Sequence, residues 1–189
     1  MPPWVHRLPN AISALRLASA PLLLLLAWGG ARRGFLIAYV VVLASDVADG
    51  FLARRLGSRS ELGARLDSWG DLATYATLPC AAWWLWPAVV RREAAFVAVA
   101  VLAYVAPVVL GWLRFGRLTS YHTRGAKAAG VLMGVALPVL FACDVAWPFH
   151  VATGVFVLAE IEEMAITLVL PGWRANVPSL VHALRLRRA

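Results

Sequence analysis

Residues 46–71 read DVADGFLARRLGSRSELGARLDSWGD, and this stretch holds four of the five aspartates of a 189-residue chain. Asp46 and Asp49 lie near the end of one apolar run, and Asp67 and Asp71 lie at the start of the next. On a helix, a spacing of three or four residues places both members of such a pair on one face. The stretch therefore predicts two helices joined by a Gly- and Arg-rich turn, with four carboxylates that can converge.

The apolar runs on either side of this stretch predict a membrane protein. The chain is 61% hydrophobic and 15% charged, whereas roughly 25% of residues are charged in ordinary soluble proteins. We predict six membrane-spanning helices at residues 11–30, 35–53, 66–90, 94–113, 126–145 and 149–170. Lipid cannot hydrogen-bond to the backbone, and none of the runs alternates like a barrel strand. We expect an all-α integral membrane protein with one domain over residues 1–189.

The basic residues predict how the helices are oriented. The formal net charge is +8, and with six spans only Arg32, Arg33, Arg91 and Arg92 of the 18 basic residues fall on the side opposite both termini. Basic connections stay in the cytoplasm, so both termini, including a basic tail at about 174–189, should lie there. A positive charge also suits nucleic acid, but the sequence contains no motif for it. We expect membrane lipids as partners and no nucleic acid.

Four converging carboxylates need positive charge nearby. Without it they repel one another and partly protonate, and a charged residue inside a membrane helix costs at least about 2.5–3.5 kcal/mol. Oxygen ligands suit Mg²⁺ or Mn²⁺, and two such ions about 3.5–4 Å apart can clamp a diphosphate. The structural alternative is that the aspartates pair with the arginines of the turn, Arg54, Arg55, Arg59 and Arg65.

The stretch resembles the signature of the CDP-alcohol phosphotransferase family, the class I CDP-alcohol phosphatidyltransferases: D-x2-D-G-x2-A-R-x8-G-x3-D-x3-D. All eight fixed positions are present, from Asp46 to Asp71. The resemblance implies a phospholipid-synthesising membrane enzyme, a homodimer, with its active site at the cytoplasmic ends of the second and third helices. It implies transfer of a phosphatidyl group from CDP-diacylglycerol to an alcohol acceptor, with release of CMP.

The resemblance also implies a role for each motif residue. Asp46 and Asp67 would bridge two divalent cations, Mg²⁺ or Mn²⁺, and Asp49 would complete the first cation site. Asp71 would contact the second cation and act as the catalytic general base. A segment before the first span resembles the family's N-x-x-T-x-x-R element, with Ser in place of Thr. The donor-binding residues implied in this way are Gly50, Arg54, Ser60, Gly63, Asn10 and Ser13.

Two further groups of charges suggest where the acceptor alcohol binds. Arg124 and Lys127 precede and begin the fifth apolar run, and Glu160 and Glu163 share a face within the sixth. Basic side chains suit a phosphorylated alcohol such as glycerol 3-phosphate, which favours phosphatidylglycerophosphate-type synthesis. The same four residues can instead form structural ion pairs.

Two other functions stay open on the sequence. The family signature is shared with enzymes that transfer the headgroup of CDP-choline or CDP-ethanolamine to diacylglycerol. Intramembrane carboxylates also serve ion and proton transporters, although the chain shows no inverted repeat or broken helix of the kind that favours transport.

Overall fold

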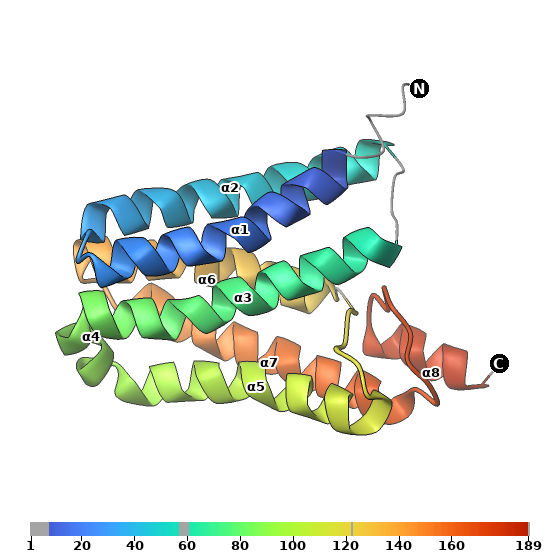
Figure 1. The fold of residues 1–189 in the computed structure, drawn as a ribbon. Helices are drawn as coiled ribbons and strands as arrows, with labels where there is room; N and C mark the ends of the chain where they lie inside the picture. The colour runs from blue at the N-terminus through green and yellow to red at the C-terminus, as the bar shows by residue number, and fades with distance from the viewer. Residues whose placement is uncertain (1–7, 57–60, 122, 189) are drawn as a thin grey trace. The chain divides into compact units, whose positions relative to one another are not determined.

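The computed structural model describes residues 8–56, 61–121 and 123–188, and this part of the chain forms eight helices and no strand (Figure 1). Six helices are long and correspond to the six predicted from the apolar runs: α1 (Leu8–Trp28), α2 (Arg32–Leu56), α3 (Glu61–Leu85), α5 (Ala94–Phe115), α6 (Arg124–Cys143) and α7 (Trp147–Val169). Two short helices, α4 (Pro87–Arg92) and α8 (Leu180–Arg188), are not predicted by those runs. The all-α prediction is confirmed for the described residues.

The helices group into two compact units, Met1–Val90 and Arg91–Ala189. In the first unit α1 packs against both α2 and α3. The turn from α1 to α2 uses Gly30, whose φ of 72° favours glycine. The core of this unit is apolar and aromatic: Ala20, Leu23, Ala27, Phe35, Tyr39, Ala81 and Leu85. A single domain over residues 1–189 stays a prediction.

In the second unit α7 packs against α5, α6 and α8. Helix α5 ends at Gly116, whose φ is 63°, and α6 begins after Thr123, whose Oγ1 accepts a hydrogen bond from the Ala126 N–H at 3.0 Å. Helix α6 ends at Asp144, which has a φ of 58°. The 116–123 connector and the turn at residue 144 therefore lie at opposite ends of α6.

Among the described residues, α5 and α6 are long and apolar enough to cross a membrane, by length and composition. Only 11% of the apolar window of α5, and 28% of that of α6, is buried. A core helix of a soluble protein would be mostly buried, whereas Leu102 and Leu113 of α5 are 67% and 78% exposed. This apolar surface suits lipid. The full set of six spans and the cytoplasmic orientation stay predictions.

The predicted end of the third span, residue 90, is wrong by five residues. Helix α3 ends at Leu85, and Pro87 begins α4. Proline lacks a backbone N–H and disfavours the helical conformation in the residue before it, but it is well suited to the first position of a new helix. The apolar run continues through this break, so hydropathy alone does not reveal it.

Candidate functional site

The aspartate motif lies on two helices, as the sequence predicts. Asp46 and Asp49 belong to α2, and Asp67 and Asp71 belong to α3, so helical spacing places each pair on one face. The side chains of these four aspartates lie outside the described residues. The same holds for the predicted donor-binding residues Gly50, Arg54, Gly63, Asn10 and Ser13 on α1 to α3, while Ser60 lies outside the described residues altogether. The convergence of the carboxylates stays a prediction.

Helix α1 is the packing partner that the two motif helices share. It contacts both α2 and α3, whereas α2 and α3 make no contact of similar extent in the described part of the chain. The motif helices are therefore held together through α1. This helix also carries the predicted donor-binding residues Asn10 and Ser13.

One buried hydroxyl near the motif has no partner. Thr74 lies on α3, three residues after Asp71, so the two residues share a face. Thr74 is 8% exposed, and its Oγ1 is the only buried side-chain polar atom without a hydrogen bond among the described residues. Thr77, one turn later, donates instead to the Ala73 carbonyl at 2.7 Å. Because buried hydroxyls are nearly always hydrogen-bonded, Thr74 indicates a polar ligand or water at this level of α3.

The predicted acceptor residues lie on α6 and α7, which pack against each other. Arg124 and Lys127 are exposed in the first turn of α6, whereas on α7 Glu160 is buried and Glu163 is half-buried. Within residues 8–56, 61–121 and 123–188, neither glutamate forms an ion pair with Arg124 or Lys127. The structural alternative of ion pairs among these four residues therefore gains no support.

Glu162, to which the sequence assigns no role, joins three helices. Its Oε1 accepts a hydrogen bond from the Leu180 N–H, at the start of α8, at 3.0 Å. A Cβ atom on Gly125 of α6 would lie 3.2 Å from Glu162 Oε2. Such a contact is tighter than usual, so glycine allows α6 and α7 to approach closely here. Glu162 thereby fixes the start of α8 beside the start of α6.

The connector before α6 is bonded to the segment before α8. The Ser120 carbonyl accepts from the Asn176 N–H at 2.8 Å, and the Leu118 carbonyl accepts from Trp173 Nε1 at 2.9 Å. The Tyr121 hydroxyl lies 2.9 Å from Thr167 Oγ1. Burial raises the pKa of Tyr121. The side chains that pack here are Tyr121, Ile166, Leu170, Val177 and Ala183.

A cavity of about 220 Å³ opens beside this packed region. It is lined by Arg124, Pro178, Ser179, Val181, His182 and Arg185. The sequence pattern indicates a binding role for Arg124 but not for His182 and Arg185, which lie within the predicted tail at 174–189. The signal lies in the spacing of Leu180, Ala183 and Leu186, which pack inward and leave the basic positions on another face.

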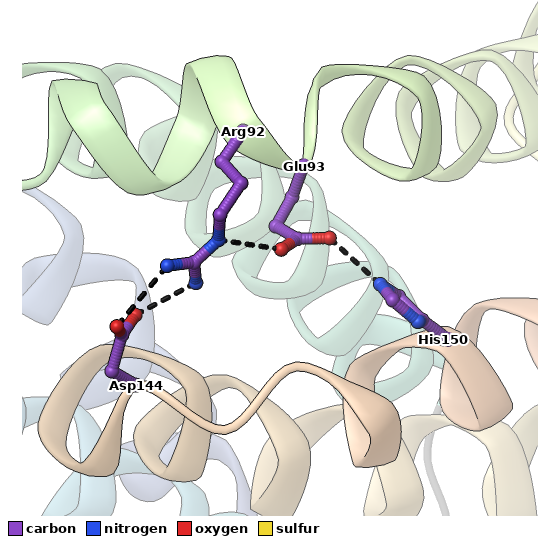
Figure 2. Close-up of polar contacts among 4 residues, drawn as sticks. All are labelled: Arg92, Glu93, Asp144 and His150. Atoms are coloured by element: carbon purple, nitrogen blue, oxygen red, sulfur yellow. Dashed lines mark hydrogen bonds and ion pairs between the residues drawn. The ribbon is translucent and has the colours of Figure 1, made fainter.

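At the other end of the second unit, four charged or titratable side chains form one network (Figure 2). The Arg92 guanidinium bonds to both carboxylate oxygens of Asp144, at 2.7 and 3.1 Å, and its Nε donates to Glu93 Oε1 at 2.8 Å. Glu93 Oε2 lies 2.7 Å from His150 Nε2, and the His150 ring stacks on Phe96. Because an ionised carboxylate only accepts, His150 Nε2 carries the proton of this bond.

Glu93 is the buried member of this network, with 7% of the residue exposed. The hydrogen bonds from His150 and Arg92 hold the pKa of the Glu93 carboxyl below its ordinary value of 4.5. The hydrogen bonds from Arg92 likewise lower the pKa of Asp144 and, in return, the pKa of Arg92 is raised. The network joins the start of α5 to the turn between α6 and α7 and leaves its buried charge fully paired.

These observations define an all-helical protein with exposed apolar helices and an aspartate motif shared between α2 and α3. The sequence model of the CDP-alcohol phosphatidyltransferase family matches residues 6–168. The chain belongs to this family, and the resemblance of its aspartate motif is thereby confirmed. The family is one of membrane-embedded transferases of phospholipid biosynthesis, generally dependent on divalent metal ions.

Several curated proteins are similar to the chain. Proteins named "Putative cardiolipin synthase" from Mycobacterium bovis and from two strains of Mycobacterium tuberculosis are each 30% identical to it over 152 residues. The alignment covers 76% of this chain and 69% of each relative. No solved structure matches the chain.

Proposed function

We propose that this protein transfers a phosphatidyl group from CDP-diacylglycerol to the hydroxyl of a glycerol-phosphate acceptor and releases CMP. The observation that carries the proposal is the complete eight-position aspartate motif, placed on α2 and α3 in a chain whose residues 6–168 match the family. The proposal includes a cytoplasmic active site and a homodimer, as the family resemblance implies.

The residues of the motif fit a pair of divalent cations. Its donors are four carboxylates, and oxygen ligands of this kind suit Mg²⁺ or Mn²⁺. The unpartnered hydroxyl of Thr74, one turn from Asp71, adds a buried polar atom at the same level of α3. We assign the cations to Asp46, Asp49, Asp67 and Asp71. When bound, they would neutralise the diphosphate charge and stabilise the leaving group.

The protein's own residues would perform the other steps. Asp71 would accept the proton of the acceptor hydroxyl on a carboxylate oxygen while that hydroxyl oxygen attacks the phosphorus of the phosphatidyl group. The bond from this phosphorus to the CMP oxygen breaks, and CMP leaves. Arg54 would hold the donor phosphates through charge-assisted hydrogen bonds, and Gly50 and Gly63 would allow the nucleotide to approach the helices closely.

Two acceptors are compatible with the proposed reaction. Glycerol 3-phosphate suits the basic side chains of Arg124 and Lys127. The name of the relatives favours phosphatidylglycerol instead, because cardiolipin is formed when a second phosphatidyl group is placed on its free glycerol hydroxyl. Both acceptors present a hydroxyl on a glycerol that carries a phosphate, so one assay can compare them.

The test is CMP release by the purified protein in detergent, with CDP-diacylglycerol, Mg²⁺ or Mn²⁺, and either acceptor. We expect acceptor-dependent release that stops with EDTA and returns with the metal. Asp71→Asn should lower the rate at least about 100-fold, because it removes the general base. Asp144→Asn is the matched control, since it alters a carboxylate outside the motif, and it should keep the wild-type rate.

Other outcomes would identify the alternative functions. Release of CMP from CDP-choline or CDP-ethanolamine with diacylglycerol, and none from CDP-diacylglycerol, would assign headgroup transfer. Metal-dependent ion flux in liposomes without CMP formation would assign transport. A wild-type rate in Asp71→Asn would contradict the proposed general base.

A further inference from the structure

The cavity beside α8 gathers positive charge without a negative side chain on its walls. Arg124, His182 and Arg185 line it, and the other wall residues, Pro178, Ser179 and Val181, are uncharged. All three basic side chains are exposed. Within the described part of the chain, none of the three side chains has a hydrogen-bond or ion-pair partner. Their charge is therefore available to a ligand.

The walls of this cavity are held by the protein's own bonds. The Pro178 carbonyl accepts from the Arg124 N–H at 3.4 Å, which ties the segment before α8 to the first residue of α6. The Ser179 carbonyl accepts from the Ala183 N–H at 3.1 Å, and Ser179 Oγ accepts from the His182 N–H at 3.3 Å. Ala183 is fully buried. Arg124 and Arg185 thus extend from helices that are fixed to each other.

The Glu162 carboxylate, which bonds at the start of α8, is already engaged. Glu162 accepts from the Leu180 N–H at 3.0 Å and is not among the residues that line the cavity. Two guanidinium groups that face one cavity can each offer paired N–H donors to phosphate oxygens. Membrane topology explains basic residues on this side of the helices. It does not explain their convergence from α6 and α8 on one cavity.

We propose that the cavity lined by Arg124, His182 and Arg185 binds a phosphate group, carried either by a soluble phosphate ester or by a phospholipid headgroup. Residues 178–185 lie beyond residues 6–168, which the family model matches, so most of this site is outside the shared catalytic region. The site does not require phosphatidyl transfer to occur.

The test compares two cavity variants of the full chain with one control variant. Arg124→Gln and Arg185→Gln each remove a charge from the cavity wall. Arg187→Gln removes the same charge from an exposed position on α8 that does not line it. Binding of glycerol 3-phosphate is measured by titration calorimetry in an uncharged detergent. The lipid arm measures the rise in Tm when phosphatidylglycerol replaces part of the phosphatidylcholine in nanodiscs.

We expect each cavity variant to weaken binding at least about 10-fold, because each loses charge-assisted hydrogen bonds, and the control Arg187→Gln to stay within about 2-fold of the wild type. If the cavity variants lose glycerol 3-phosphate binding in the calorimetry, the ligand is a soluble phosphate ester. If they lose the rise in Tm with phosphatidylglycerol, the ligand is a lipid headgroup. Unchanged behaviour of both cavity variants in both arms, or an equal loss in Arg187→Gln, would overturn the site. The Tm of each variant without ligand verifies that the variant is folded.

CMP release measured on the same samples separates this proposal from the proposed function. If the wild type releases no CMP but Arg185→Gln loses phosphate binding, the cavity stands and the phosphatidyl transfer fails. If CMP is released and the cavity variants bind phosphate like the wild type, phosphatidyl transfer stands and the cavity proposal fails.

Discussion

The two ends of the second unit differ in how their charged side chains are bonded. At one end Arg92, Glu93, Asp144 and His150 are joined by hydrogen bonds and ion pairs (Figure 2). At the other end, about 33 Å away along the 22 residues of α5, Arg124, His182 and Arg185 line a cavity, and their side chains have no partner among the described residues.

This difference distinguishes a structural role of charge from a binding role. Glu93 is buried, and an unpaired buried carboxylate is strongly unfavourable, so its partners are needed for folding. The three basic residues of the cavity are exposed and hydrated, so the fold does not need them to be paired. Mutations at the paired end should therefore change stability, and mutations at the cavity should change binding.

The largest change in stability is expected from Glu93→Ala. It leaves Arg92 and His150 without their shared carboxylate, but both side chains are partly exposed, at 46% and 35%, and water can reach them. We therefore expect a loss of about 1–2 kcal/mol in the free energy of unfolding, or about 2–8 °C in Tm. A thermal unfolding curve of the purified protein in detergent measures it.

Glu93→Gln provides the matched control for this experiment. It removes the charge but keeps a carbonyl oxygen that can accept from either partner, so its Tm should fall less than that of Glu93→Ala. An unchanged Tm in Glu93→Ala would show that the network does not stabilise the fold.

A smaller difference in Tm is expected between substitutions of two arginines, one at each end of the second unit. Arg92→Gln removes hydrogen bonds to Asp144 and Glu93 and should lower Tm, whereas Arg124→Gln removes no side-chain hydrogen bond within the described residues and should leave Tm within experimental error. Both substitutions remove one positive charge, so net charge cannot account for a difference. Equal falls in Tm would remove the distinction between the two ends.

The sequence predicts the long helices well because lipid-compatible runs are a strong signal. The predicted spans 94–113, 126–145 and 149–170 differ by at most two residues from the ends of α5, α6 and α7. The failure at the end of α3 comes from Pro87, which breaks the helix without interrupting the apolar run. The short helix α8 is missed because its nine residues are rich in arginine.

The candidate site, like the helices, has a part that the sequence predicts and a part that it does not predict. The aspartate motif is local, with fixed spacing over 26 residues, so it can be identified in the sequence, and the convergence of its carboxylates stays a prediction. The cavity joins Arg124 to Arg185, and the paired network joins Arg92 to Asp144. These contacts depend on how α6, α7 and α8 pack, and no spacing rule connects residues so far apart in the chain.

The smallest effect should appear in the pH dependence of the paired end. Because hydrogen bonds from His150 and Arg92 lower the pKa of folded Glu93, the ionised carboxylate adds stability that is fully present above its ordinary pKa of 4.5. That stability is lost as pH falls through the lower folded value. Other carboxylates, Asp144 among them, add pH dependence of the same sign, but Glu93→Gln retains them. The difference in Tm between wild type and Glu93→Gln should therefore shrink as pH falls below 4.5. A difference that stays constant down to pH 3 would show that the partners of Glu93 do not favour its ionised form.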